Sequence, residues 1–323
     1  MIRRVYAAVV KTIGQGPVYE LVDVPQPTKN QVQIQVIAAG IHKVVRSIAD
    51  GRHYVKVKTL PFIPGIDGVG TLPDGKKVYF VNMAPPNGTM SQLVNADENM
   101  TIPLPENADP VHFAAIMNAG LASWTALTER AQIKSGETVL VLGVTGSSGQ
   151  MAAASARLLG AKRVVGVGRN KSLLNQLVAD GTIDVSVPLD DDDTKYQELI
   201  AKEAADVDIV MDFLWGRPTE IAMAGIHSGR NDSSQHLRWV QVGQMAGATI
   251  QLNGGFLRSK NVELIGSGIG PISMKQMLQS LQRMVPMVVE GKLKTSVLTI
   301  PLKDIESKWQ ETADAKERVV VVM

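Results

Sequence analysis

Cysteine is absent from all 323 residues of the chain, and its absence excludes several chemistries at once. Without cysteine the chain has no disulfide, no thiolate zinc site, no iron–sulfur cluster and no cysteine nucleophile. Aromatic residues are also scarce, at 4% of the chain, so we expect a core built from Val, Ile, Leu, Met and Ala.

An excess of either charge is likewise missing. The 33 Lys and Arg residues against 31 Asp and Glu leave a net charge of +2, which gives no electrostatic reason to expect a nucleic-acid or membrane partner. No apolar run reaches the roughly 20 residues of a membrane span, and the opening MIRRVYAAVV lacks the length and cleavage pattern of a signal peptide. We therefore expect a soluble, cytoplasmic protein, whose length favours two domains.

The first 115 or so residues contain short β-like runs broken by Gly and Pro. Residues 32–36 (VQIQV) alternate apolar and polar side chains, as in a strand with one buried face, and residues 76–81 (KKVYFV) form a similar run. Nine prolines between Pro25 and Pro105 exclude long helices there. This part of the sequence predicts an irregular β domain.

After that point apolar strands alternate with helical segments. The expected strands cover 139–142, 163–167, 183–187, 207–211, 238–242 and 262–265. Helical patterns cover about 150–159, 172–179, 194–204 and 274–290, and Pro218 suits the first turn of one more helix. This alternation predicts a doubly wound parallel sheet. The strand-like runs 299–302 and 319–322 suggest that the tail returns to the first domain.

Four consecutive aspartates, residues 190–193, form the one run of like charge. Calcium ligands are usually spaced rather than consecutive, so we favour a solvated loop that caps the helix at Thr194 over a metal site.

A glycine-rich loop lies between the first strand of the second part and its helix. Gly143, Gly146 and Gly149 are spaced three residues apart. In a dinucleotide fingerprint the first glycine permits a tight turn, the second lets the backbone approach a pyrophosphate, and the third lets helix and strand pack closely. Backbone N–H groups of Gly146, Ser147 and Ser148 would then point at the anion. A purely structural tight turn is the alternative.

The end of the next strand indicates which dinucleotide is bound. An NAD site places Asp or Glu there, to bind the ribose 2′-hydroxyl. Here the segment Gly168-Arg169-Asn170-Lys171 has no acidic residue, and Arg169 and Lys171 would instead meet a 2′-phosphate. The sequence therefore favours NADPH, unless Arg169 is simply a solvated residue after a strand.

The whole chain resembles the zinc-independent, quinone oxidoreductase-like branch of the medium-chain dehydrogenase/reductase superfamily. The matching motifs are AAGIH at 38–42, IPGIDGVG at 63–70, GTMSQLV at 88–94, residues 120–127, residues 139–149, EGKL at 290–293 and IPL at 300–302. The resemblance implies an α/β fold in which a Rossmann doubly wound parallel sheet is inserted into a GroES-like β domain. It places the GroES-like domain at 1–118, completed by 270–323, and the Rossmann domain at 119–269, with the cofactor in the cleft between them.

The resemblance also bears on metal and on assembly. Zinc alcohol dehydrogenases of this superfamily bind metal at positions that hold His42, Ile66 and Asp67 here, and the four-cysteine lobe is absent. Those positions supply too few ligands, so we expect no metal. Quinone oxidoreductases commonly carry Asn where His42 stands and Asp where Val45 stands, so the substrate end of the cleft is not a close copy of theirs. A homodimer is implied.

Cofactor and acceptor contacts follow from the loop and the resemblance. The expected cofactor-binding residues are Gly143, Thr145, Gly146, Ser147, Ser148, Gly149, Gly168, Arg169, Asn170, Lys171, Val242, Gly243, Ser267 and Gly268. His42 is the favoured catalytic residue, as a hydrogen-bond donor to a carbonyl or a proton source, and Tyr54 is a second candidate proton donor. Arg46, His53, Asn118 and Trp215 are candidate substrate-binding residues. Structural alternatives stay open for four of these residues: His42 as a histidine bonded to backbone, Tyr54 as a packed surface tyrosine, Arg46 as a surface charge, and Trp215 as interdomain packing.

Without a metal to polarise an alcohol, reduction of an activated acceptor is the easier chemistry. The sequence therefore predicts an NADPH-dependent oxidoreductase that transfers hydride to a small-molecule acceptor, a quinone or an α,β-unsaturated carbonyl. The alternative is a non-catalytic NADPH-binding redox sensor or structural protein. A nucleic-acid-binding role finds no support in the charge or aromatic content.

Overall fold

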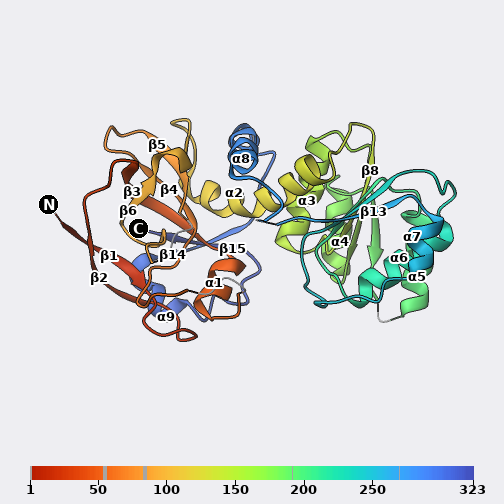
Figure 1. Cartoon of the computed structure of the whole chain (residues 1–323), viewed down its shortest axis with the longest axis horizontal. Helices are drawn as coiled ribbons and strands as arrows, with labels where there is room; N and C mark the ends of the chain where they lie inside the picture. Colours follow the sequence, from red (N-terminus) through yellow and green to blue (C-terminus); the bar gives the residue numbers. More distant parts are fainter. Residues whose placement is uncertain (1, 54–56, 83–85, 191, 269) are drawn as a thin grey trace. The chain divides into compact units, whose positions relative to one another are not determined.

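The computed structural model describes residues 2–53, 57–82, 86–190, 192–268 and 270–323. The chain divides into two compact units, which we call unit 1 (Met1–Asn118 with Leu281–Met323) and unit 2 (Ala119–Ser280). It passes from unit 1 to unit 2 within α2 (Pro110–Thr125) and returns within α8 (Met274–Val289), as the colours of Figure 1 show.

Unit 2 is built on a six-stranded sheet in which all neighbouring strands are parallel. Its strands are β8 (Thr138–Leu142), β9 (Arg163–Gly168), β10 (Val185–Pro188), β11 (Ile209–Asp212), β12 (Leu237–Gln241) and β13 (Val262–Gly266). Their spatial order, β10-β9-β8-β11-β12-β13, is that of a Rossmann fold, with its topological switch point between β8 and β11. The predicted doubly wound sheet is confirmed.

Helices connect these strands. They are α3 (Ser147–Leu158), α4 (Lys171–Ala179), α5 (Asp193–Glu203), α6 (Arg217–Gly229) and α7 (Gly254–Ser259). A π-helical turn, η2 (Ala126–Arg130), precedes β8. Some element ends differ from expectation: α3 begins at Ser147 rather than near Gln150, and β10 begins at Val185 rather than Ile183. The N–H of Ile183 closes the turn after α4 by donating to Leu177, so this residue packs in the core from a loop.

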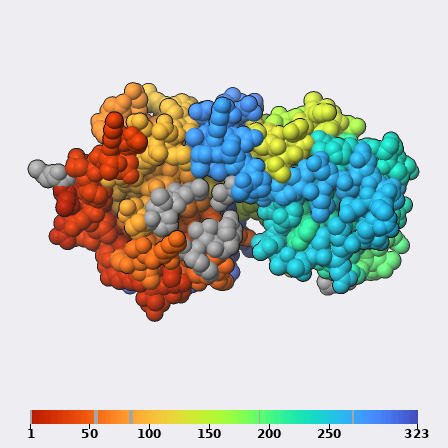
Figure 2. All heavy atoms as spheres, viewed as in Figure 1, coloured from red at the N-terminus to blue at the C-terminus, as the bar shows by residue number. Residues whose placement is uncertain are grey.

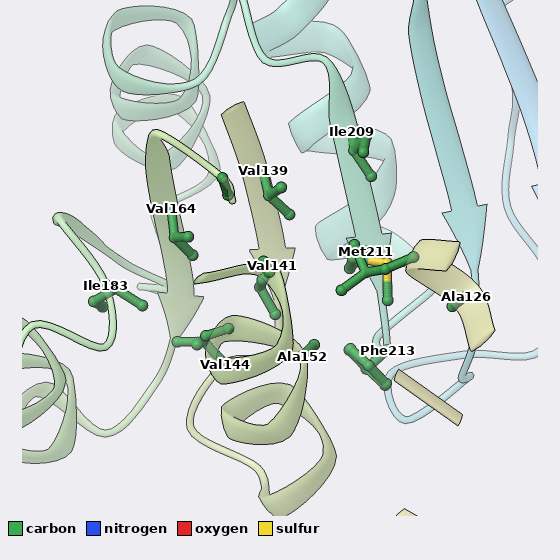
Figure 3. Packing of buried hydrophobic residues seen from close by; sticks show 14 of the residues in the cluster. Ala126, Val139, Val141, Val144, Ala152, Val164, Ile183, Ile209, Met211 and Phe213 are labelled. Carbon is green, nitrogen blue, oxygen red and sulfur yellow. The ribbon is translucent and has the colours of Figure 1, made fainter. Parts of the chain in front are cut away.

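Side chains of β8 alternate between two hydrophobic clusters, because neighbouring residues of a strand face opposite sides of the sheet. Val139 and Val141 pack in a cluster that contains residues of α3 and α4, shown in Figure 3. Leu140 and Leu142 pack in the cluster that contains residues of α5 and α6. Helices therefore cover the sheet on both faces, which explains the unbroken apolar run in the sequence.

One acidic residue of the aspartate run caps a helix. An Asp192 side-chain oxygen accepts hydrogen bonds from the backbone N–H groups of Thr194 and Lys195, so Asp192 is the N-cap of α5. The predicted capping role is confirmed, although Asp191 lies outside the described residues.

Unit 1 combines a β-hairpin with a seven-stranded sheet. The hairpin is β1 (Arg3–Val9) and β2 (Val18–Val24). The sheet contains β3 (Gln31–Ile41), β4 (Asp67–Thr71), β5 (Lys77–Val81), β6 (Leu93–Asp97), β7 (Thr101–Pro103), β14 (Val297–Pro301) and β15 (Arg318–Val322). Short helical segments are α1 (Lys43–Ala49), η1 (Glu98–Met100), η3 (Leu302–Asp304) and α9 (Ile305–Lys308). The irregular β domain expected from the prolines is confirmed.

The C-terminal strands complete this sheet. β15 pairs antiparallel with β3, so that Val320 lies opposite Gly40, and β14 pairs parallel with β15. In Figure 1 the blue C-terminal strands accordingly lie among the red and orange strands of unit 1. The expected return of the tail to the first domain is confirmed. It also places Arg318, the first residue of β15, on the strand next to the one that leads to His42.

Candidate functional site

The glycine loop lies at the carboxyl end of β8, on the edge of the sheet where the switch point opens. Gly143 has φ +90° and packs against the turn that follows β11: an added Cβ would lie 3.0 Å from Leu214 Cδ2. At Gly149 an added Cβ would lie 2.2 Å from the carbonyl oxygen of Gly143, so no larger residue fits between helix and strand. The protein itself therefore requires glycine at both positions.

Gly146 differs from these two glycines. Its φ is −81°, which any residue adopts, and a Cβ added there would meet only the Gly143 carbonyl oxygen, at 3.5 Å. Gly146 is exposed, and nothing in the protein's own packing requires glycine there. Space kept open at this one position suits the close approach of a ligand backbone such as a pyrophosphate.

The N-terminus of α3 adds the electrostatics for an anion. Gly146 is the N-cap of this helix, without a side-chain cap, and its first turn contains no acidic residue. The first N–H groups of a helix have no partner within it and carry its positive dipole end. Ser147 and Ser148 are half-buried there, and Ser123 Oγ donates to the Ser148 carbonyl at 3.0 Å. The loop and the helix start fit a dinucleotide.

The segment after β9 brings the predicted cofactor-selecting residues together. An added Cβ at Gly168 would lie 2.5 Å from Thr145 Cγ2, so Gly168 packs against the glycine loop. Arg169 is exposed, Asn170 caps α4 by accepting from Leu173 N–H, and Lys171 pairs with Asp190 at 3.1 Å. Arg169 is therefore better placed than Lys171 to meet a phosphate, because Asp190 already neutralises part of the lysine's charge.

The expected nicotinamide-binding residues lie where β12 and β13 end. The backbone N–H groups of Val242 and Gly243 donate to the carbonyl of Asp212, and Ser267 N–H donates to the Gln241 carbonyl. Around Gly268, which is exposed, an added Cβ would have no neighbour within 4 Å. These positions share the carboxyl edge of the sheet with the glycine loop, as the parallel strand order requires.

His42 belongs to a buried polar network within unit 1. It is 3% exposed, at the N-cap of α1, and its Nε2 lies 2.7 Å from Asp67 Oδ1. Its Nδ1 lies 2.5 Å from Arg318 Nη2. Because a guanidinium only donates, Nδ1 must accept, so Nε2 carries the proton and donates to Asp67. Both ring nitrogens are thus in use within unit 1, and His42 does not donate to backbone as its structural alternative supposed.

Asp67 is the centre of this network, and its exposed fraction is zero. Its second carboxylate oxygen accepts from the Tyr79 hydroxyl at 2.7 Å. Burial, aided by the negative charge of Asp67, raises the pKa of Tyr79, while burial lowers the pKa of Arg318 against the opposing effect of Asp67. Four side chains from β3–α1, β4, β5 and β15 therefore share one half-buried cation and one buried anion.

The candidate acceptor residues are not brought together within either unit. Arg46 donates to Thr312 Oγ1 and lies 4.5 Å from the centre of the Trp309 ring, so its guanidinium already has partners in unit 1. His53 follows α1, and Asn118 is half-buried on α2. Trp215 belongs to unit 2, and Tyr54 lies outside the described residues. Their roles stay predictions.

Sequence reasoning missed Asp212, at the end of β11. It has no exposed surface, and its carboxylate accepts four hydrogen bonds. An Asp that ends a buried strand is a usable signal for such a residue. Tyr79 and Arg318 were also missed, and the partner of Arg318 lies 276 residues away in the sequence.

The described residues contain neither a cluster of metal ligands nor a membrane-spanning helix. In the described ranges, no group of three or more His, Cys, Asp or Glu side chains is arranged to hold a metal ion. No helix in the part of the chain that the structure describes is long and apolar enough to cross a membrane.

Comparisons with known proteins agree with this geometry, although no protein-family model matches the chain. A probable NADPH-dependent quinone reductase of Emericella nidulans is 29% identical, with 98% of this chain and 99% of that protein covered. Among solved structures, the quinone oxidoreductase from Thermus thermophilus has a TM-score of 0.76 and 25% identity, over 98% of this chain and 100% of that one. A mycobacterial quinone oxidoreductase has a TM-score of 0.84 at 18% identity, over 99% and 100% of the two chains.

The Rossmann sheet of unit 2, the mostly antiparallel sheet of unit 1 and the glycine loop define the class. The chain is an oxidoreductase with the two-domain fold of the medium-chain dehydrogenases/reductases. Within that class it is quinone oxidoreductase-like, as its full-length relative and this structural neighbour show. The resemblance to quinone oxidoreductases seen in the sequence motifs is confirmed, and zinc independence stays a prediction.

Proposed function

We propose that the chain is an NADPH-dependent, zinc-independent oxidoreductase that transfers a hydride to a quinone or an α,β-unsaturated carbonyl acceptor. The observation that carries the proposal is Gly146. It is the one glycine of the loop that the protein's own packing does not require, and it lies at the N-terminus of α3. The relative from Emericella nidulans is named an NADPH-dependent quinone reductase, and the Thermus thermophilus enzyme was solved in complex with NADPH.

The chain's own residues supply binding and orientation, and bound NADPH would supply the hydride. Backbone N–H groups at the start of α3 bind the pyrophosphate, and Arg169 binds the 2′-phosphate with its planar fork. The end of β13, at the exposed Gly268, would offer backbone to the nicotinamide carboxamide, whereas the Gly243 N–H after β12 already donates to Asp212. The segment after β9 contains no acid that would select a ribose hydroxyl instead.

Zinc independence rests on the chemistry of the donor set. His42 and Asp67 occupy positions that supply metal ligands in zinc-dependent relatives, but His42 Nδ1 accepts from Arg318 and Asp67 accepts from His42 and Tyr79. The half-buried guanidinium of Arg318 beside the imidazole opposes a divalent cation by charge repulsion. In this proposal the network replaces a metal centre as the tie between β3, β4 and β15.

A screen of acceptors tests the proposal. The purified protein is expected to oxidise NADPH when offered a panel of quinones, enals, enones and nitroalkenes, measured by the loss of NADPH fluorescence. Tight NADPH binding without turnover of any acceptor would favour the redox sensor or structural role instead. A protein that binds neither NADPH nor NADH would overturn both.

Replacing Arg169 tests the choice of cofactor. Arg169→Ala is expected to raise KM for NADPH about 10- to 100-fold, because a charge-assisted phosphate contact is lost, and to change KM for NADH little. Lys171→Ala is the matched control: its partner Asp190 already holds it, so the expected increase is smaller. Equal use of NADH and NADPH by the wild type, unchanged by Arg169→Ala, would refute the assignment.

The remaining roles and partners are also proposals. We propose Tyr54 as a candidate proton donor, and His53, Asn118 and Trp215 as candidate acceptor contacts. His42 and Arg46 could take their predicted roles only by giving up the contacts that they make within unit 1. A homodimer and a cytoplasmic location complete the proposal; light scattering and cell fractionation would decide them. The cyan-to-light-blue part of unit 2 is on the surface in Figure 2, and exposed large apolar residues of this part of the sequence include Leu252, Leu257 and Leu264.

A further inference from the structure

The turn Phe213–Gly216, which follows β11, has an unusual backbone. Trp215 has φ +55° and Gly216 has φ +68°, so two successive residues are left-handed. A bulky residue such as tryptophan rarely adopts this conformation, and it persists only where surrounding contacts hold it. We call residues 213–216 the switch-point turn, because β11 borders the switch point of the sheet.

Asp212 holds the switch-point turn in this conformation. One of its carboxylate oxygens, Oδ1, accepts from the backbone N–H groups of Leu214 and Trp215, each at 2.9 Å. Its main-chain carbonyl accepts from Val242 and Gly243, in the loop after β12. The same residue therefore fixes the loops that follow two neighbouring strands.

The second carboxylate oxygen is anchored from behind. Asp212 Oδ2 accepts from Thr219 Oγ1 at 2.7 Å and from the indole N–H of Trp239 at 3.0 Å. Four donors face two oxygens, an arrangement that suits a carboxylate and leaves no place for a proton. Burial raises the pKa of Asp212, and these four hydrogen bonds oppose that effect.

The switch-point turn contacts the glycine loop and the loop after β12. Leu214 and Phe213 are the nearest neighbours of an added Cβ at Gly143, at 3.0 and 3.6 Å. The carbonyls of Phe213 and Leu214 accept from Met245 and Ala246 N–H groups. Figure 3 shows the geometry: Phe213 lies beyond Met211 at the same end of the sheet where Val144 lies beyond Val141. Any shift of the turn is therefore transmitted to the glycine loop, where we propose that the pyrophosphate binds.

We infer that Asp212 is a positioning residue for the dinucleotide: its carboxylate holds Trp215 left-handed, and the switch-point turn in turn fixes the glycine loop and the loop after β12. The inference rests on the proposed function. It concerns the affinity for the cofactor rather than the chemical step. Asp212 is buried and would touch neither the cofactor nor the acceptor. A role in general stability alone is the competing explanation.

A pair of substitutions at Trp215 separates backbone shape from side-chain loss. Both Trp215→Gly and Trp215→Pro remove the indole. Glycine keeps φ +55° without strain, whereas proline fixes φ near −65° and removes the N–H that donates a hydrogen bond to Asp212. We expect the NADPH dissociation constant, measured by fluorescence titration, to be at least about tenfold higher for the proline variant than for the glycine variant. Equal constants in two folded variants would overturn the inference.

A second pair tests the carboxylate itself. In Asp212→Asn the amide group faces two of the four donors, so the turn or its anchor must move. In Trp239→Phe only one donor to Oδ2 is lost. We expect Asp212→Asn to raise KM for NADPH at least about tenfold with a much smaller change in kcat, and Trp239→Phe to lower the melting temperature without a comparable rise in KM.

The outcomes distinguish this inference from the proposed function. If the wild type binds no NADPH, the proposed function fails. If the wild type binds NADPH but the Asp212→Asn and Trp239→Phe variants raise KM equally, Asp212 acts only through stability and the inference fails while the function stands. Should Asp212→Asn not fold, the Trp215 pair decides alone, because those substitutions leave the Asp212 side chain and its anchor in place.

Discussion

Gly146→Ala is expected to fold normally and to lose most of its affinity for NADPH. The protein has room for the added Cβ, whose nearest neighbour would be 3.5 Å away, and φ is −81°. The stability effects are small and opposed: alanine lowers the entropy of the unfolded chain but is a poorer N-cap than glycine. We therefore expect a melting temperature within about 3 °C of the wild type.

The predicted loss of affinity in Gly146→Ala comes from the ligand side. A methyl group at the N-cap of α3 would keep a pyrophosphate away from the N–H groups of Ser147 and Ser148. Losing two charge-assisted hydrogen bonds costs about 3 kcal/mol, or roughly a 100-fold higher dissociation constant for NADPH. Fluorescence titration measures this constant directly, without an acceptor.

Gly149→Ala is the matched control for this prediction. Its Cβ would lie 2.2 Å from the Gly143 carbonyl oxygen and 2.7 Å from Val144 Cα, both backbone atoms that cannot swing aside. We expect it to destabilise unit 2 by about 1–3 kcal/mol through overpacking. The two variants, at positions three residues apart, should thus lose different properties: Gly146→Ala loses NADPH affinity and Gly149→Ala loses stability. If a folded Gly146→Ala variant binds NADPH as tightly as the wild type, the glycine loop is not the pyrophosphate-binding site.

Local patterns in the sequence were enough to predict the Rossmann unit. The central strand β8 is a short apolar run covered on both faces, and some helix starts have a local signal, such as Asp192 before α5 or Pro218 at the first turn of α6. The glycine loop is also local, since strand, turn and helix follow one another directly. Element ends were less predictable: Ile183 is buried like a strand residue but closes a turn.

The polar networks could not be predicted in the same way, because they join distant segments. His42 and Arg318 are 276 residues apart, and only the pairing of β15 with β3 brings them together. The pattern of the last strand is that of an apolar run after three charged residues, Lys316, Glu317 and Arg318, and nothing local distinguishes Arg318 among them. Likewise, the left-handed backbone at Trp215 depends on Asp212, and no residue type in that turn announces it. Sequence reasoning therefore found His42 without its partners.

Removing the charge of Asp67 is expected to destabilise unit 1 strongly. Asp67→Asn keeps the shape of the side chain and leaves Arg318 as a half-buried cation without its anion. Breaking a buried pair in this way costs about 3 kcal/mol or somewhat more. Hydrogen exchange measured by mass spectrometry reads the two units separately, so peptides from β3, β4 and β15 should exchange faster while peptides from β8 and β11 do not change.

A surface pair of the same residue types provides the control. Arg4 and Asp23 lie 3.4 Å apart within unit 1, but their side chains are 68% and 66% exposed. Solvent-exposed pairs contribute between about 0 and 1 kcal/mol, so Asp23→Asn should leave exchange nearly unchanged. Equal effects of Asp23→Asn and Asp67→Asn would show that burial of the network contributes nothing.

Combining two substitutions tests whether Asp67 and Arg318, which both contact His42, stabilise the fold as one charge pair. Arg318→Met alone leaves Asp67 without a cation and His42 Nδ1 without a donor, so it should also destabilise unit 1. In the double variant Arg318→Met with Asp67→Asn, neither charge remains buried and uncompensated. We therefore expect the double variant to lose less stability than the sum of the two single variants, by about 1–3 kcal/mol. Strict additivity would mean that cation and anion are stabilised independently, and that His42 does not couple the tail strand to β4.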